Sequence, residues 1–306
     1  MSLLFTKKAP HSPTSPLPHT PHPTPHTPHP MLEALQFDFM RHAIAAGILV
    51  SIACGIVGTL VVVNRVVFIS GGIAHAAYGG IGIGYFFGIN PLVGAIFFTF
   101  FSALGMGFLQ RRIRERSDTL IGVMWAIGMA IGVIFIDLTP GYKADLMSYL
   151  FGSILTVPRD DLWIMAGIDI LIITLVSIFY KELLAISFDE TFAIIRNIPV
   201  EVIYLGLMGI TALTIVAVMQ VVGLIMVIAL LTIPAAISGQ FVKNMKGMMV
   251  LAIILGVVFT LVGLWLSYSL NLTSGATIIL VAGLGYLISL AWKPFILTIT
   301  RKIANL

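Results

Sequence analysis

The amino-acid sequence predicts an all-α, polytopic membrane protein with about eight or nine transmembrane helices. Of its 306 residues, 58% are hydrophobic and 10% are charged, and the mean hydropathy is +1.05. A soluble domain carries roughly 25% charged residues, so this composition excludes a soluble globular protein. Crossing a hydrocarbon core about 30 Å thick takes roughly 20 helical residues, and apolar runs of that length recur beyond residue 42.

The chain divides into a tail, residues 1–30, and a transmembrane domain, residues 31–306. From Pro10 to Pro30 the tail is dominated by Pro, Thr, Ser and His, which bury too little apolar surface to offset the entropy of ordering. We therefore expect disorder. Four histidines recur at spacings of three or four: His19, His22, His26 and His29. Because neutral imidazole binds Zn²⁺ and Cu²⁺, weak metal capture is one interpretation. A neutral extension, or a misassigned start with Met31 as the first residue, is the alternative.

Nine apolar segments are long enough to be the spans. Along the chain they cover residues 42 to 64, 66 to 88, 91 to 110, 119 to 138, 162 to 181, 200 to 219, 221 to 238, 248 to 268 and 274 to 291. A further stretch, residues 139 to 161, is too short and broken to span but too apolar for an ordinary loop. We expect this stretch to lie at the outer face of the membrane or to dip into it.

The basic residues indicate the orientation of the spans. Alternation places one set of loops on the same side as the C-terminal tail: Arg65, residues 111 to 116, residues 181 to 196 and residues 243 to 246. Together with the C-terminal tail, these segments hold twelve of the seventeen Lys and Arg residues. Because Lys and Arg are enriched in cytoplasmic loops, the sequence predicts a cytoplasmic C-terminus and an external N-terminus.

His75 is an ionisable residue inside the second expected span, in the segment VVFISGGIAHAAYGGIGIGYFFGI. Counted from Val66 at about 1.5 Å per residue, it lies roughly 14 Å deep, near the bilayer midplane. An ionisable side chain there costs roughly 2 to 3 kcal/mol or more, which indicates a substrate, ion or proton path. Small residues recur every four positions and predict close helix packing beside His75: Gly72, Ala76, Gly80, Gly84 and Gly88. A histidine satisfied by a backbone carbonyl is the alternative.

Asp169 is the one acid well inside an expected span, in IMAGIDILIITLV. It lies about 10 Å from the outer end of the fifth span by the same helical rise. A carboxylate at this depth could take part in the translocation path together with His75. A hydrogen bond to a neighbouring helix, or a small water cavity, would explain it equally well.

Several activities are excluded by missing motifs. No G-x-x-x-x-G-K-[ST] phosphate loop occurs, so the chain does not hydrolyse ATP by the P-loop route. The single cysteine, Cys54, excludes an intrachain disulfide and a cysteine-cluster metal site. No H-E-x-x-H pair occurs, which argues against an intramembrane metalloprotease.

Seven segments in the same order resemble the permease subunits of ABC importers for zinc and manganese. They are MRHAIAAGILVSIACGIVGTLVVVNR, SGGIAHAAYGGIGIG, SDTLIGVMWAIGMAIGVI, DLMSYLFGSIL, SFDETFA, VVGLIMVIALLTIPAAISGQF and LTSGATIILVAG. The resemblance implies a type II-like permease in a prokaryotic cell membrane. It implies a homodimer with cytoplasmic ATPases and an external metal receptor, and no catalysis by this chain. The implied cargo is Zn²⁺ first, with Mn²⁺ or iron as alternatives, and no permanently bound cofactor is expected.

The resemblance also assigns a region that docks on the ATPase, residues 234 to 246. Its candidate residues are Pro234, Ala235, Ala236, Gln240 and Lys243. Because proline disfavours a continuing helix, we expect Pro234 to end the seventh span and a short helix to follow at the inner surface. A plain connecting loop is the alternative. Asp189 and Glu190 lie in a second cytoplasmic turn, which could contact the ATPase or simply be solvated.

The sequence departs from the family pattern beside His75. The pattern has an aspartate four residues earlier, on the same helical face, where this chain has Gly71. Another residue such as Asp169 could supply the carboxylate, the ion could be bound through fewer protein ligands, or the cargo could differ. A proton-coupled secondary carrier with His75 and Asp169 as relay groups is the alternative function. Such carriers usually hold more intramembrane acids and show internal repeats, and no convincing repeat occurs here.

Overall fold

The spanning helices are those that the sequence predicts. The computed structural model describes residues 36–113, 117–141, 150 and 152–304, with side chains described up to residue 292. The tail with its four histidines lies outside these residues. Within them no strand occurs, and nine helices are long and apolar enough to cross a membrane. They are α2 (Asp38–Val63), α3 (Val67–Phe86), α4 (Pro91–Arg112), α5 (Ser117–Leu138), α7 (Arg159–Ile178), α10 (Val200–Val222), α11 (Leu224–Phe241), α12 (Met245–Leu270) and α13 (Ser274–Ala304).

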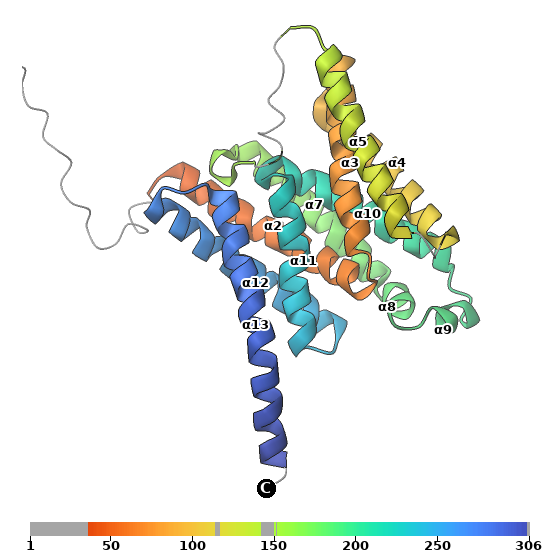
Figure 1. Ribbon diagram of the computed structural model, residues 1–306, viewed down its shortest axis with the longest axis vertical. Coiled ribbons are helices and arrows are strands. Elements are labelled where there is room, and N and C mark those ends of the chain that lie inside the picture. Colours follow the sequence, from red (N-terminus) through yellow and green to blue (C-terminus); the bar gives the residue numbers. More distant parts are fainter. Residues whose placement is uncertain (1–35, 114–116, 142–149, 151, 305–306) are drawn as a thin grey trace, which may run out of the picture.

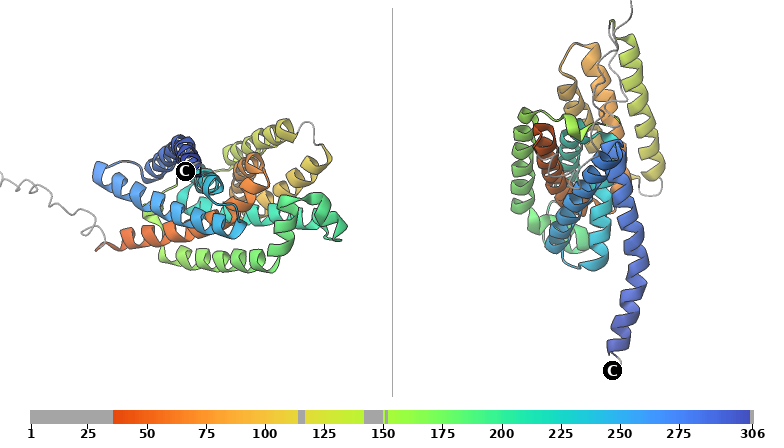
Figure 2. Two further views of the ribbon diagram at one scale, coloured as in Figure 1. Left: turned by 90° about the horizontal axis from the view of Figure 1, so that it is seen from below. Right: turned by 90° about the vertical axis from the view of Figure 1, so that its left-hand side faces the viewer.

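The helices pack in two groups, as Figures 1 and 2 show. Helix α3 packs along α4 and α5, and these three helices form the first group. In the second group α7, α11 and α12 pack on α2, while α13 packs on α11 and α12. Helix α10 contacts both groups, chiefly through α4 in the first group and through α2 and α11 in the second. All spans are helical because lipid offers no hydrogen-bond partners to an open backbone.

Loops that alternation assigns to one side do meet at one end of the bundle. The Asn64 side chain, after α2, donates to Ser187 Oγ of α8 (Tyr180–Phe188) at 2.9 Å. Arg111, near the end of α4, forms an ion pair with Glu190, the first residue of α9 (Glu190–Ile195). We call this end, which carries Arg65 and Arg111, the basic end. Its formation confirms that these loops share one side.

The described part of the expected outer segment packs into the bundle and does not span. It contains a short 3-10 helix, η2 (Ile154–Thr156), whose Ile154 is buried against α2. Gly152 has a positive φ of 57° and crosses the turn between α10 and α11 at Gly223, whose φ is 79°. A Cβ on Gly152 would lie 2.7 Å from the Gly223 Cα, so the crossing requires glycine. Residues 142–149 of this segment lie outside the described residues.

The expectation that Pro234 ends the seventh span is wrong. Pro234 lies inside α11, which continues to Phe241, and no separate short helix follows before α12 begins at Met245. Proline removes one backbone N–H, and inside a packed membrane bundle neighbouring groups compensate for that loss. Pro234 is buried among the neighbouring helices, which hold α11 together across it. Tertiary packing therefore outweighs the local preference of proline.

The small-residue stripe allows close packing within α3, whereas its last member, Gly88, lies beyond the end of the helix, and an added Cβ there would meet nothing within 4 Å. A Cβ on Gly72 would lie 2.8 Å from the Ile121 side chain of α5. A Cβ on Gly80 would lie 2.6 Å from the Ala95 Cα of α4, and a Cβ on Gly84 would lie 2.7 Å from the Pro91 Cα. At Gly80 and Gly84 these separations leave no room for a methyl group against the facing backbone. The stripe thus fixes α3 between α4 and α5.

A Gly80→Ala substitution is expected to destabilise the protein by about 1 to 3 kcal/mol, because the new methyl group overpacks the α3–α4 contact. The matched control is Gly105→Ala on α4, where an added Cβ meets nothing within 4 Å. The measurement is the midpoint of thermal unfolding in detergent. Gly80→Ala should unfold at a lower temperature than the control, and equal midpoints would contradict the close contact.

Candidate functional site

His75 stacks on a tryptophan that sequence reasoning did not single out. The His75 and Trp125 ring centroids are 4.1 Å apart, and the planes differ by 18°. Both side chains are half-buried, so the pair borders the surface of the α3–α5 group. His75 Nδ1 is buried and has no hydrogen-bond partner among the described residues. The alternative of an imidazole satisfied by a backbone carbonyl therefore finds no support at this nitrogen. An imidazole nitrogen without a protein partner is a candidate ligand for a metal ion or acceptor for a proton.

Gly71 leaves open space one helical turn before His75. A Cβ at Gly71 would meet nothing within 4 Å. Crowding at the Cβ position therefore does not explain why this chain lacks a carboxylate there. Residues four apart share a helical face, so a side chain at Gly71 would project beside the imidazole.

A Gly71→Asp substitution is expected to tighten binding of divalent metal, because it adds a carboxylate ligand next to His75. In the metal-free protein the buried carboxyl group is expected to cost about 2 to 3 kcal/mol of stability. The test is metal binding to the purified protein by isothermal titration, together with its thermal unfolding midpoint. The matched variant Gly71→Asn has the same shape without the charge and should bind less tightly. Unchanged binding in Gly71→Asp would show that the His75 face does not contact the ion.

Asp169 is enclosed between α7 and its neighbours. Only 6% of the residue is exposed, and Oδ2 has no hydrogen-bond partner among the described residues. An unpartnered buried polar atom costs about 1 to 3 kcal/mol, so a functional reason is expected for its presence. The proposed hydrogen bond to a neighbouring helix is not formed by this oxygen.

The structure does not join His75 and Asp169 in one site. His75 lies on α3, which packs on α4 and α5, whereas Asp169 lies on α7, which packs on α2 and α10. Among the described residues, no three His, Cys, Asp or Glu side chains gather closely enough to hold one metal ion. A high-affinity metal centre is therefore not formed by these residue types within the described part of one chain.

The residues predicted to contact the ATPase are mostly packed inside the bundle. Pro234 and Ala235 are buried, and Ala236 is half-buried. Gln240 is also half-buried, and its side-chain nitrogen donates to Ser289 Oγ of α13 at 3.2 Å. Lys243, between α11 and α12, is exposed. Of the five, Lys243 is thus the one best placed to meet a partner.

An exposed apolar surface covers the α8–α9 turn at the basic end. Four large apolar side chains are between 50% and 73% exposed: Phe188, Phe192, Ile194 and Ile195. Asp189 caps α9 by accepting from the Phe192 N–H at 3.0 Å, and so fixes the turn between the two helices. We call these four residues the α9 patch. Asp189 is thus a capping residue, and Glu190 points to Arg111.

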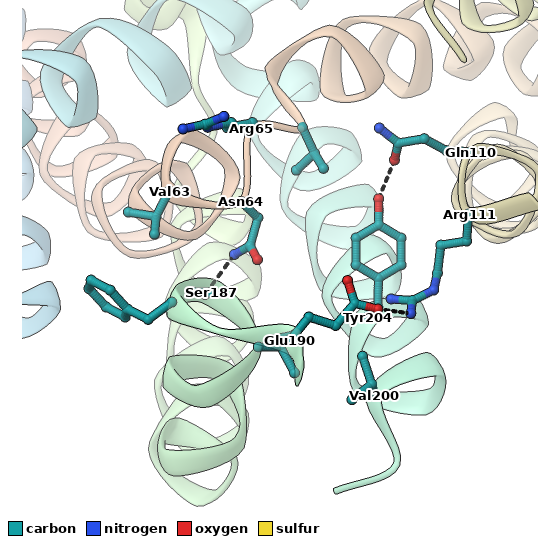
Figure 3. A pocket seen from close by; sticks show the side chains of 12 residues that line it. Val63, Asn64, Arg65, Gln110, Arg111, Ser187, Glu190, Val200 and Tyr204 are labelled. Carbon is teal, nitrogen blue, oxygen red and sulfur yellow. Dashed lines mark hydrogen bonds and ion pairs between the residues drawn. The ribbon is translucent and has the colours of Figure 1, made fainter. Parts of the chain in front are cut away.

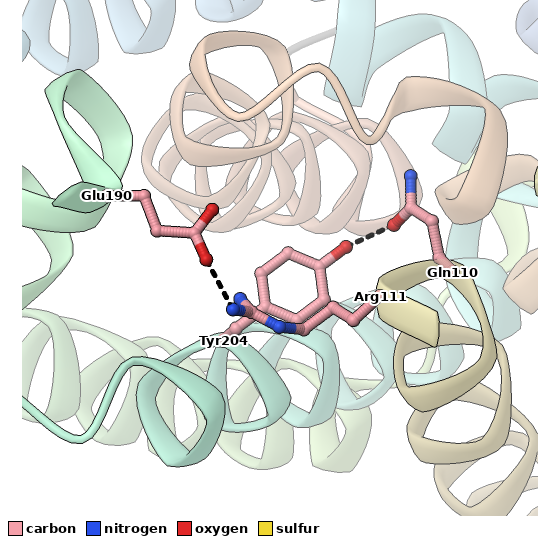
Figure 4. A network of polar contacts seen from close by, with 4 residues as sticks. All are labelled: Gln110, Arg111, Glu190 and Tyr204. Carbon is pink, nitrogen blue, oxygen red and sulfur yellow. Dashed lines mark hydrogen bonds and ion pairs between the residues drawn. The ribbon is translucent and has the colours of Figure 1, made fainter. Parts of the chain in front are cut away.

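A cavity of about 500 Å³ opens at the basic end beside this turn (Figure 3). It is lined by residues from the ends of α2, α4, α8 and α10. Arg111 and Glu190 pair across it at 2.5 Å, and the Arg111 guanidinium lies 5.1 Å from the Tyr204 ring centroid. The Tyr204 hydroxyl donates to the Gln110 carbonyl oxygen (Figure 4). Sequence reasoning did not find this network, because its members lie 79 and 94 residues apart.

Comparison with known proteins gives consistent matches over the helical domain. Residues 36–293 match the ABC 3 transport family. The uncharacterized membrane protein slr2045 of Synechocystis sp. is 64% identical over 263 residues, which cover 86% of this chain and 94% of that protein. The manganese transport system membrane protein MntC of Listeria monocytogenes is 35% identical over 260 residues, covering 85% of this chain and 92% of that protein.

A solved structure shows the same arrangement of helices. PsaBC from Streptococcus pneumoniae in complex with Fab aligns with a TM-score of 0.75 at 33% identity. The alignment covers 84% of this chain and 93% of that chain. The likeness therefore includes most of the nine spanning helices.

Proposed function

The chain belongs to the ABC 3 transport family and is the permease subunit of an ABC metal importer, and we propose that it carries Mn²⁺ into the cytoplasm as a homodimer. It is a multi-pass protein of the cell membrane and not an enzyme, and ATP is hydrolysed by a separate subunit. The observation that carries the proposal is the match of residues 36–293 to this family.

Manganese is proposed ahead of zinc. Sequence reasoning put Zn²⁺ first, but relatives with 31–35% identity are named for manganese transport. Imidazole and carboxylate ligands serve both ions, so the donor types alone do not decide between them. The ion is cargo, and we propose that the chain holds no permanent cofactor.

We place the ion path along the α3–α5 face that carries His75 and Trp125. This choice is supported by the unpartnered Nδ1 and the open space at Gly71. Since the described part of one chain gathers no three ligands of the usual types, a second copy would contribute a second His75 across a dimer interface. Weak binding through few ligands suits a permease, because an ion held tightly cannot leave. Asp169 is the next candidate for the path.

We propose that the ATPase docks on the α9 patch, with the basic end facing the cytoplasm and the N-terminus outside. Exposed apolar side chains at an aqueous surface indicate an interaction site. The concentration of Lys and Arg in these loops supports the orientation. Lys243 could add a contact to the ATPase at the edge of this docking surface. A metal-binding receptor docks at the opposite face, and membrane lipid surrounds the spans.

The experiment is ATP hydrolysis by the complete complex in lipid nanodiscs. The chain is assembled with its ATPase and receptor, and the receptor is empty or loaded with Mn²⁺, Zn²⁺ or Fe²⁺. The Mn²⁺-loaded receptor should raise the hydrolysis rate most. Equal stimulation by all three ions would contradict the choice of manganese, and no dependence on receptor would contradict the importer function.

A further inference from the structure

We propose that Arg111, Glu190, Tyr204 and Gln110 form a polar clamp that transmits movement of the ATPase-docking turn to the helices of the ion path. This inference rests on the proposed docking of the ATPase at the α9 patch. It assigns positioning roles to four residues that neither bind the ion nor belong to the α9 patch.

The clamp connects three elements through two consecutive residues of α4. Arg111 Nη2 lies 2.5 Å from Glu190 Oε1 and so connects α4 to α9. Gln110 accepts a hydrogen bond from the Tyr204 hydroxyl and so connects α4 to α10. The Arg111 guanidinium also lies over the Tyr204 ring, which joins the two contacts into one unit (Figure 4). A guanidinium paired with a carboxylate on one side and resting on an aromatic ring on the other has little freedom to move.

Helix α9 has few other attachments to the bundle. It packs on α8 and touches α10, while Phe192, Ile194 and Ile195 are exposed. The Glu190 side chain connects α9 to α4 through its ion pair with Arg111. The ion pair is partly shielded, with side-chain exposures of 25% for Arg111 and 40% for Glu190. Solvent therefore screens it less than a fully exposed pair.

Helix α4 leads directly to the ion path. It packs tightly on α3 through the Gly80–Ala95 contact, and α3 carries His75. A displacement of α9 by the ATPase would pull on Arg111, move α4 as a rigid helix and shift α3 against α5. Packed helices transmit such shifts because close-packed interfaces deform little.

A charge exchange tests the clamp. The variants are Arg111→Glu, Glu190→Arg and the double exchange, reconstituted with the ATPase and receptor. Two quantities are measured: ATPase retained on the purified permease, and metal taken up per ATP hydrolysed. Each single variant should retain the ATPase but lose at least about fivefold in uptake per ATP, the lower end for coupling between sites. The double variant should recover most of that loss.

The control is Arg112→Glu, which makes the same change one residue later, where the guanidinium lies 4.6 Å from the Phe108 ring centroid and forms no ion pair among the described residues. It should leave uptake per ATP unchanged. If the exchange variants do not fold, Glu190→Gln keeps the shape of the side chain, removes its charge and should show the same loss.

Unchanged uptake per ATP in the single variants, or no recovery in the double variant, would overturn the clamp. Loss of bound ATPase in the single variants would also overturn it, because Glu190 would then belong to the docking surface. Failure of the wild type to retain ATPase would instead overturn the proposed docking.

Discussion

Replacing His75 with alanine is expected to lower ATP-dependent metal uptake by roughly tenfold or more, the scale on which groups around a metal site affect its activity. The physical reason is that imidazole replaces part of the hydration shell that the ion loses near the bilayer centre. Nδ1 is buried without a partner among the described residues, so no structural hydrogen bond through this atom is lost in the variant. The measurement is the initial rate of uptake into proteoliposomes that contain the permease, ATPase and receptor.

His42→Ala is the matched control, because His42 lies near the start of α2, at the membrane surface, and should not contact the ion. ATP hydrolysis is recorded in parallel. A loss of uptake with normal hydrolysis would assign His75 to the path and not to assembly. Unchanged uptake would move the path away from His75, and Asp169→Asn would then be the next variant.

Alanine substitution of Phe192 and Ile195 is expected to weaken ATPase binding by about thirtyfold or more. Buried anchors of a protein interface commonly contribute about 2 kcal/mol or more when truncated, and 1.4 kcal/mol corresponds to tenfold in affinity. Both side chains are at least half exposed in the isolated permease, so their loss costs little folding stability. The measurement is the dissociation constant of the ATPase for the permease in nanodiscs.

Two controls define where the ATPase docks. Ile254→Ala removes a side chain that is 53% exposed on the spanning helix α12 and should leave ATPase affinity unchanged. Lys243→Glu tests the region that the family resemblance favours, and a small effect is expected from a rim residue. If Lys243→Glu abolishes binding while the α9 variants retain it, the docking site lies at the α11–α12 connection instead.

The spans could be predicted because bilayer thickness dictates their length. Each expected apolar segment corresponds to one described spanning helix, with ends that differ by a few residues, except that α13 continues to Ala304, well beyond the expected end at residue 291. The small-residue stripe of α3 was equally readable, since helices that approach closely in lipid need residues such as Gly80. The hydropathy of the sequence therefore indicates directly where the spans lie.

The neighbours of His75 and Arg111 could not be predicted from the sequence in the same way. His75 lies eight residues after the start of α3, and Trp125 lies eight residues after the start of α5, so both have the same depth if the helices are parallel neighbours. Because successive spans cross the membrane in alternating directions, the sequence indicates that α3 and α5 run parallel. Only the packing of the structure shows that these two helices are adjacent. Pro234 was misjudged for a related reason, because a local helix-breaking tendency yields to surrounding helices.

The most direct test of the central claim is metal uptake into proteoliposomes that hold this chain with its ATPase and receptor, with and without ATP, across Mn²⁺, Zn²⁺ and Fe²⁺. We expect uptake that requires ATP and receptor and is fastest for Mn²⁺. Uptake by the chain alone without ATP, driven by a proton gradient, would contradict the account of an ABC importer permease.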